Sequence, residues 1–149
     1  MGELIIEPGQ SDTGALGHIS NTALPGWFQE GRKALLQRAT PALNPGEWLL
    51  LVVRYEVELL RQMFPDAPVT IRTGVESLGN SSIRFFQQAW QHGLLSATGR
   101  AVLVHCDDQT QRALALTPAM RGFLSTLLMA GDAPPAEQPK ERQQEDQRP

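Results

Sequence analysis

Two patterns of residues that can carry chemistry share one short segment, residues 11–21 (SDTGALGHISN). Asp12 begins the tripeptide Asp-Thr-Gly, on which homodimeric aspartic proteases build two carboxylates that share one proton. His18 and Asn21 follow in the same segment, and their imidazole and amide can orient water or stabilise a developing negative charge. The segment is therefore either the catalytic loop of an aspartic protease or the start of a site built on the helix that follows.

The protease alternative is disfavoured by the residues around the tripeptide. Two catalytic carboxylates must be held close together, so Asp-Thr-Gly has to end a buried apolar strand. Here Asp12 follows residues 8–11 (PGQS), which form no apolar run, and the residues after it lead into a helical pattern. A match of three residues also arises easily by chance.

The elements that position this segment are predicted from periodicity. A β-branched run at residues 3–7, closed by Pro8 and Gly9, indicates a first strand. Residues 21–39 place apolar side chains at helical spacing, with Pro25 in the first turn and the N-cap at Asn21 or Thr22. Strands are expected next at residues 48–60, 67–78, 81–91 and 94–106, and a closing helix at residues 117–130.

The turns between the later strands indicate how the sheet is built. Residues 78–80 (LGN) and 92–93 (HG) are short enough for hairpins, so the sheet should be largely antiparallel. Val69, Ile71, Thr73 and Val75 alternate along one strand and should share its buried face. A single long helix with this much apolar surface must be wrapped by the sheet that follows it. The sequence therefore predicts an α+β fold with one central helix and a curved antiparallel sheet.

Composition limits the class of protein. The 149 residues fit one domain, which we place at residues 1–130, and residues 131–149 lack apolar periodicity and are predicted to be a disordered tail. The net charge of −3, with basic residues scattered among acids, gives no surface for nucleic acid. Cys106 is the single cysteine, which fits a cytoplasmic protein without disulfides. No apolar run reaches the ~18 residues of a membrane span, so we expect no membrane partner.

Other sites that can carry chemistry are weakly supported. His92 falls in a predicted turn, and His105 beside Cys106 has no third ligand at suitable spacing, so we expect no metal. The sequence has no G-x-S-x-G, no phosphate-binding loop with a Walker pattern and no G-x-G-x-x-G. These absences disfavour a serine hydrolase, a nucleotide hydrolase and a dinucleotide enzyme, and we expect no cofactor.

The motif and the order of elements together resemble a known family. Asp12, residues 17–21 (GHISN), Glu30 and Arg32 are similar to the D-x-D-x-x-G-H-V-N-N…E-x-R signature of hotdog-fold acyl-CoA thioesterases, the 4-hydroxybenzoyl-CoA thioesterase-like superfamily. The similarity covers about residues 4–128 and includes residues 53–61, 69–90 and 99–118. It implies a hotdog fold, in which the sheet wraps the long helix and two chains form two active sites at their interface.

The chain departs from this signature at Gly14, where the commonest version of the family carries its catalytic aspartate. Other branches of the fold place the catalytic carboxylate on the long helix, so the resemblance implies Glu30 as the substitute and Asp12 as the next candidate. At ~100° per residue, Glu30 lies about 120° from the apolar stripe, beside Trp27, where partial burial would favour a general base. The alternative is a solvated Glu30 that pairs with Lys33 at i+3.

The start of the helix is expected to supply the rest of the site. Its free N–H groups and the positive end of its dipole can receive the thioester oxygen as it becomes an oxyanion. Asn21 adds an amide donor, although capping the helix is an equally good role for it. His18 could orient water or line the entrance, or serve as a hydrogen-bonded structural residue. The expected contacts to substrate and coenzyme A are Gly17, His18, Thr22, Trp27, Asn80 and Ser82.

The sequence thus predicts an acyl-CoA thioesterase of lipid metabolism that hydrolyses a fatty acyl-CoA to free acid and coenzyme A, with Glu30 as general base or nucleophile. A hotdog protein that only binds acyl groups is the alternative. Asn21 and Glu30 are nine residues apart, or about 13 Å along one helix, whereas reacting groups must lie within about 3.5 Å. One helix cannot supply both, which predicts a homodimer with composite sites, either alone or as a dimer of dimers.

Overall fold

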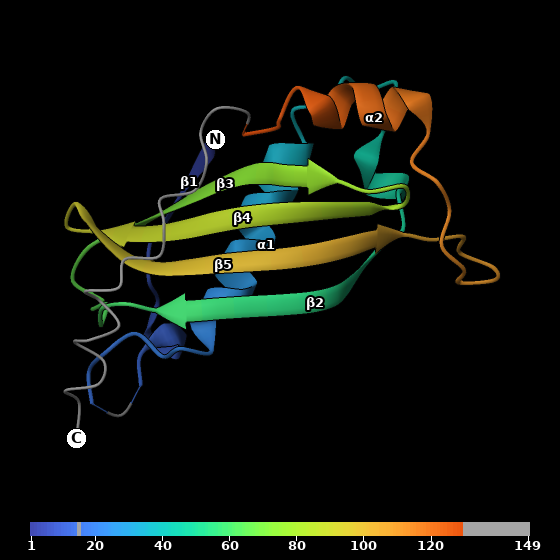
Figure 1. Ribbon diagram of the computed structural model, residues 1–149. Helices are drawn as coiled ribbons and strands as arrows, with labels where there is room; N and C mark the ends of the chain where they lie inside the picture. The colour runs from blue at the N-terminus through green and yellow to red at the C-terminus, as the bar shows by residue number, and fades with distance from the viewer. Residues whose placement is uncertain (15, 130–149) are drawn as a thin grey trace.

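The computed structural model describes residues 1–14 and 16–129. Along the chain the elements follow the predicted order of one strand, a long helix, four strands and a short helix (Figure 1). Their bounds are β1 Gly2–Ile6, α1 Ala23–Leu36, β2 Leu50–Leu59, β3 Val69–Leu78, β4 Ser82–Gln91, β5 Leu94–His105 and α2 Pro118–Ser125. Two short 3₁₀ turns, η1 (Gln10–Asp12) and η2 (Pro45–Glu47), precede α1 and β2.

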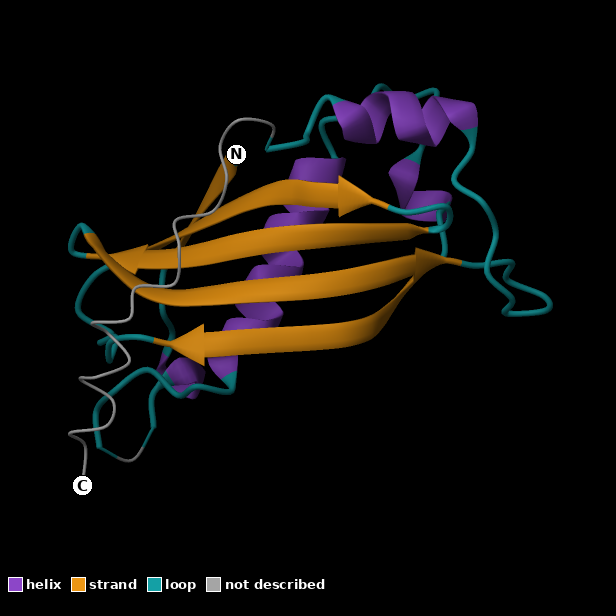
Figure 2. Cartoon of the chain, viewed as in Figure 1, coloured by secondary structure: helices purple, strands orange, loops and turns teal. Residues whose placement is uncertain are grey.

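The five strands form one antiparallel sheet in the order β1-β3-β4-β5-β2. Helix α1 lies across one face of this sheet, crosswise to the strands, and α2 lies beyond the end of β3 (Figures 1 and 2). Strands β1 and β2 are the two edges of the sheet. This is the predicted α+β architecture, with the long helix against an antiparallel sheet.

The face of the sheet that contacts α1 is apolar, as the alternation in β3 predicts. Val69, Ile71, Thr73 and Val75 are each exposed by 1% or less. The apolar residues of the core form two clusters, one toward each end of α1, with Val69 and Ile71 in the first and Val75 in the second. The first cluster is built around Leu24, Trp27, Phe28, Met63, Val69, Ile71, Ala89 and Ala97, and the second around Leu35, Val75, Ile83, Phe85, Ala101, Leu103, Met120 and Leu124.

Two glycines bring α1 close to the sheet. A Cβ on Gly31 would lie 2.7 Å from Thr73 Oγ1 and 2.8 Å from Ile71 Cγ2, and one on Gly99 would lie 2.7 Å from the ring of Phe28. Real Cβ atoms do not approach neighbours this closely, so any larger residue would force the helix and sheet apart. Close packing thus explains a glycine in the interior of α1, where glycine costs about 1 kcal/mol relative to alanine.

A buried amide joins the helix to the sheet. Gln87 Nε2 donates to the carbonyl oxygen of Phe28 at 2.7 Å and to Thr73 Oγ1 at 2.9 Å, and its Oε1 accepts from Arg32 Nη1 at 3.0 Å. Burial lowers the pKa of Arg32, and the proximity of Tyr55 partly opposes that effect. Arg32, the arginine of the E-x-R pattern, therefore holds the helix on the sheet.

The closing helix is shorter than the sequence predicts. Thr117 caps it by accepting a hydrogen bond from Met120 N–H at 3.1 Å, but the helix ends at Ser125. The chain then pairs with β3, because Val75 N–H donates to Leu127 O and Met129 N–H donates to Val75 O. The backbone of residues 127–129 thus bonds to the sheet rather than extending the helix, and the predicted tail at residues 131–149 lies outside the described residues.

Candidate functional site

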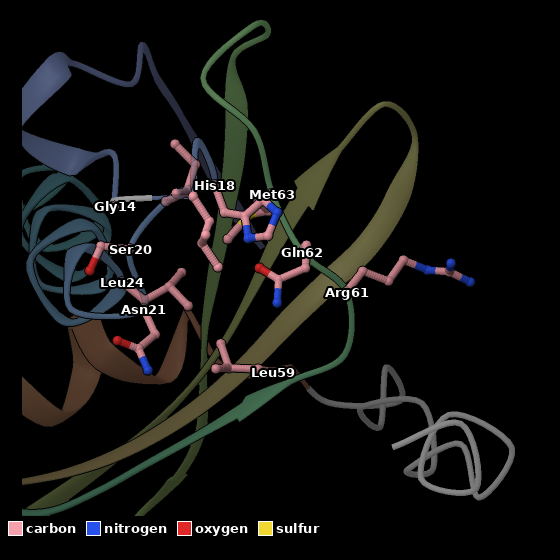
Figure 3. Close-up of a pocket in the computed structure, with 11 residues that line it drawn as sticks. Gly14, His18, Ser20, Asn21, Leu24, Leu59, Arg61, Gln62 and Met63 are labelled. Atoms are coloured by element: carbon pink, nitrogen blue, oxygen red, sulfur yellow. The ribbon is translucent and has the colours of Figure 1, made fainter. Parts of the chain in front are cut away.

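A pocket of about 280 Å³ lies at the N-terminal end of α1 (Figure 3). Three segments form its walls: the loop before α1, the first turn of α1, and the end of β2 with the loop that follows. The lining residues are Gly14, Leu16, His18, Ile19, Ser20, Asn21, Leu24, Leu59, Arg61, Gln62 and Met63. Of the candidate site residues, His18 and Asn21 are in this lining, where they meet a second segment about 40 positions further along the chain; Gly17 and Thr22 are not in it.

The loop before α1 is held in shape by its own backbone. Gly14 N–H donates to His18 O at 2.7 Å, Gly17 N–H donates to Gly14 O at 3.1 Å, and Thr13 and Ile19 form an antiparallel bridge. Gly17 has a φ of +79°, a left-handed conformation that glycine adopts without steric cost. The glycine of the motif thus makes the tight turn that places His18 and Asn21 in the pocket wall.

Asp12 has a structural role in this loop. Its Oδ2 accepts a hydrogen bond from Gly9 N–H at 2.8 Å, which closes the 3₁₀ turn η1, and its carbonyl oxygen accepts from Ser20 N–H at 2.6 Å. The carboxylate is turned back onto its own turn and is not part of the pocket lining. The acid of the Asp-Thr-Gly tripeptide is thus already engaged in local structure.

The helix begins at Ala23, with Thr22 as its N-cap, one of the two residues predicted for this position. The Thr22 side chain does not cap the helix, because its hydroxyl hydrogen-bonds to that of Ser20 at 2.8 Å. Asn21 lies in the pocket wall with its amide exposed (Figure 3). Asn21 and Leu24 are both lining residues, so the positive end of the helix dipole borders the pocket.

His18 lines the pocket and stacks edge-on against Phe64, with ring centroids 5.3 Å apart and an angle of 86° between the rings. This contact supports the imidazole from the side of the loop after β2. The half-buried ring keeps access to the pocket (Figure 3). His18 can therefore contact a ligand while also closing one wall.

Glu30 lies outside this pocket. It is exposed on α1, and among the residues that the structure describes no ion pair involves it, including the predicted pair with Lys33. The expected partial burial beside Trp27 is wrong within one chain, because Trp27 turns into the core and is 7% exposed. Trp27 is accordingly a core residue here and does not line the pocket.

Gly14, by contrast, lies in the pocket wall. It occupies the position at which the resembling family carries its aspartate. A Cβ placed on Gly14 would meet only the carbonyl oxygen of His18, at 3.7 Å, and the backbone is not in the left-handed region. The site therefore has room for a side chain at this position, and no carboxylate is among the lining residues described.

Asn80 and Ser82 lie at the opposite end of the sheet from the pocket of the same chain. The strand pairing places the start of β4 beside the end of β5, whereas the pocket is at the end of β2. Arg121 of α2 donates to the carbonyl oxygens of Gly79 and Asn80 at 2.8 and 3.3 Å. Within one chain these two residues therefore do not reach the site.

The loop after β2 is the part of the site that the sequence analysis missed. Leu59, Arg61, Gln62 and Met63 line the pocket, but they follow a predicted strand with no recognisable motif. The only signal that could have found them is the strand pairing. Because β2 pairs with β5 at the edge of the sheet, the end of β2 lies at the N-terminal end of α1. In the described part of the chain, no three His, Cys, Asp or Glu residues are grouped to hold a metal ion, and neither helix is long and apolar enough to cross a membrane.

A helix start that faces a pocket at one end of a five-stranded antiparallel sheet is the architecture of a hotdog-fold protein. The family model of the thioesterase-like superfamily matches residues 8–124, and the chain belongs to this superfamily. No curated protein sequence matches the chain.

Solved structures agree with this assignment. A predicted thioesterase from Bacillus stearothermophilus is 33% identical, with a TM-score of 0.78 over 85% of this chain and 95% of that one. A Thermus thermophilus thioesterase, solved with coenzyme A and Zn, is 27% identical, with a TM-score of 0.75 over 84% and 92%. The Staphylococcus aureus DHNA-CoA thioesterase, at 17% identity and a TM-score of 0.76 over 89% and 94%, shares the fold. The predicted hotdog fold and the resemblance to thioesterases are confirmed.

Proposed function

We propose that this protein is an acyl-CoA thioesterase that hydrolyses fatty acyl-CoA to the free acid and coenzyme A. The observation that carries the proposal is the pocket at the N-terminal end of α1, in a member of the thioesterase-like superfamily. The thioester carbonyl is received by the helix N–H groups and by the Asn21 amide, which stabilise its oxygen as negative charge develops. Leu24 and Leu59 in the lining suit an apolar acyl chain.

In this proposal Glu30 activates the attack, either by taking a proton from water or by adding to the carbonyl carbon itself. The carbon–sulfur bond then breaks, and coenzyme A leaves as the thiolate and takes up a proton. When water attacks, the free acid forms in this step; when Glu30 attacks, a second water hydrolyses the acyl-glutamyl anhydride, which releases the acid and restores the carboxylate. Because Glu30 lies outside this pocket, about 10 Å along α1 from its first residue Ala23, the proposal takes the carboxylate from a second chain. The function proposed here therefore depends on a homodimer, which also forms the unit of any dimer of dimers.

The open edge of the sheet supports such a dimer. Among the described residues, strand β2 has no partner on its outer side, and it exposes Leu51, Val52, Val53 and Tyr55 by 38, 50, 61 and 37%. An exposed apolar edge strand is a template for pairing with another strand. The occupant proposed here is β2 of a second copy, antiparallel about a two-fold axis.

This pairing accounts for the position of Asn80 and Ser82. A two-fold axis through β2 places the start of the partner strand beside the end of β2, where the pocket lies. The β3–β4 turn is at that same end of the partner sheet. In the proposed dimer, Asn80 and Ser82 of each chain approach coenzyme A in the pocket of the other chain.

The test is a panel of acyl-CoA thioesters of increasing chain length, with release of free coenzyme A followed by a thiol reagent. Thiol release above the uncatalysed rate, with a preference for apolar acyl groups, is the expected result. Binding of acyl-CoA without thiol release would instead establish the second candidate function, an acyl-binding protein. That alternative is favoured by one observation, the absence of a carboxylate among the described lining residues.

A further inference from the structure

We propose that Arg61 and Gln62, in the loop after β2, recognise the coenzyme A portion of the substrate. In this assignment the Gln62 amide contacts the pantetheine arm and the Arg61 guanidinium contacts a phosphate of the nucleotide. The inference rests on the proposed function and extends it from the reacting carbonyl to the group that carries the acyl chain. Both residues line the pocket.

The backbone on the strand side of this pair is fixed. Leu60, immediately before it, is buried with 7% exposure. The N–H groups of Leu60 and Arg61 both donate to the carbonyl oxygen of Ser96, at 2.9 and 3.1 Å. These bonds continue the β2–β5 pairing past the end of β2, so the loop leaves the sheet in a defined direction.

The backbone on the other side is fixed as well. Met63 is buried with 4% exposure, and its carbonyl oxygen accepts from Ile19 N–H at 2.7 Å. Gln91 then holds the next residue, because its Oε1 accepts from Phe64 N–H at 2.9 Å and its Nε2 donates to Phe64 O at 2.6 Å. Arg61 and Gln62 are therefore exposed side chains on a rigid backbone, which lowers the entropy cost of binding a ligand.

Charge and direction fit the two roles. Within the described residues no carboxylate pairs with Arg61, so its guanidinium is available to an anion. Figure 3 shows Gln62 directed toward the other side chains that line the pocket and Arg61 directed away from them. In this view Asn21 at the helix start, Gln62 and Arg61 follow one another in that order, so an amide and then a cation succeed the helix start.

An acyl-CoA presents its groups in the same order. Its thioester carbonyl is followed by two amides of pantetheine and then by phosphates. A guanidinium binds phosphate through charge-assisted hydrogen bonds, which are about twice as strong as neutral ones. A carboxamide matches an amide of pantetheine as both donor and acceptor. The pocket therefore has one polar group for each successive part of the carrier.

The experiment uses the full chain and two non-hydrolysable ligands, the S-octyl thioethers of coenzyme A and of pantetheine, titrated by calorimetry. For Arg61→Ala we expect about ten-fold weaker binding of the coenzyme A thioether and unchanged binding of the pantetheine thioether. Gln62→Ala should weaken both ligands by the same factor. Arg38→Ala, an exposed arginine just past the C-terminal end of α1, is the matched control and should change neither.

Wild-type protein supplies a measurement that needs no variant. Its preference for the coenzyme A thioether over the pantetheine thioether should shrink as ionic strength rises, because salt screens a contact at an exposed guanidinium. Equal loss of both ligands in Arg61→Ala, or no loss of either, would overturn the inference and leave the proposed function standing. If wild-type protein bound neither thioether, the proposed function and this inference would both be overturned.

Discussion

The N–H of Ile19 donates a hydrogen bond of 2.7 Å to the carbonyl oxygen of Met63. This bond joins the loop before α1 to the loop after β2, and both residues line the pocket that these loops enclose. The shape of the site is thus determined by a contact between distant parts of the sequence. A motif at residues 11–21 supplies only one wall of it.

Two glycines of α1 should respond in opposite ways to alanine. Gly31→Ala should lower the free energy of unfolding by about 1–3 kcal/mol, because the new Cβ would lie 2.7 Å from Thr73 Oγ1. Gly26→Ala should raise it by up to about 1 kcal/mol, since that position is open and alanine favours a helix. Urea unfolding followed by circular dichroism measures both. Equal effects at the two positions would contradict the close packing of α1 on the sheet.

Most of the fold was predictable because it follows from local periodicity. The alternation Val69, Ile71, Thr73, Val75 identified the buried face of β3, and short turns identified the antiparallel hairpins. The closing helix was predicted too long because its last residues have helical propensity but pair with β3 instead. Propensity gave no sign of that tertiary hydrogen bonding.

The site was predictable only where it is local. The loop at residues 11–21 and the start of α1 were found from their residue types, and both line the pocket. Arg61 and Gln62 were missed, because only the pairing of β2 with β5 brings them there. Trp27 was assigned to substrate, but an aromatic residue on an apolar stripe turned into the core instead.

Truncation after Gly131 tests the assignment of the C-terminal segment. Residues 132–149 carry no apolar periodicity, so their removal should shift the melting temperature by less than about 2 °C and leave turnover unchanged. Thermal unfolding and the thiol-release assay measure the two quantities. A loss of many degrees would show that the segment contributes buried surface, and the domain limit at residue 130 would be wrong.

A carboxylate introduced in the pocket wall should increase hydrolysis. Gly14→Asp places an acid at a position where a Cβ meets only His18 O at 3.7 Å, so the protein should fold normally. We expect turnover to rise by at least about ten-fold. A well-positioned acid or base contributes about 100-fold or more, so ten-fold is the least that a useful new carboxylate should give. Gly14→Asn is the uncharged control of the same shape and should give no gain. Equal rates for the two variants would exclude a role for the new charge.

Glu30→Gln should lower kcat by about 100-fold or more while changing KM little, since a general base or nucleophile acts on the reaction step. Lys33→Gln, on the same exposed side of α1, is the matched control and should retain normal turnover. Steady-state kinetics with the best substrate of the acyl-CoA panel measures both. If the folded Glu30→Gln protein kept a near-normal kcat, Glu30 would be a solvated surface residue with no part in catalysis.

Subunit mixing tests whether each site is shared between two chains. In the proposed dimer, Asn21 of one chain and Glu30 of the other act together, so Asn21→Asp and Glu30→Ala homodimers should both be inactive. A mixed dimer has one site with both defects and one site with neither. After exchange of equal amounts, half of the dimers are mixed and each has one intact site, so activity should return to about a quarter of wild type. The measurement is thiol release before and after exchange, with mixed dimers counted by native mass spectrometry. If mixed dimers form without any recovery, each site is contained within one chain and the composite mechanism is wrong.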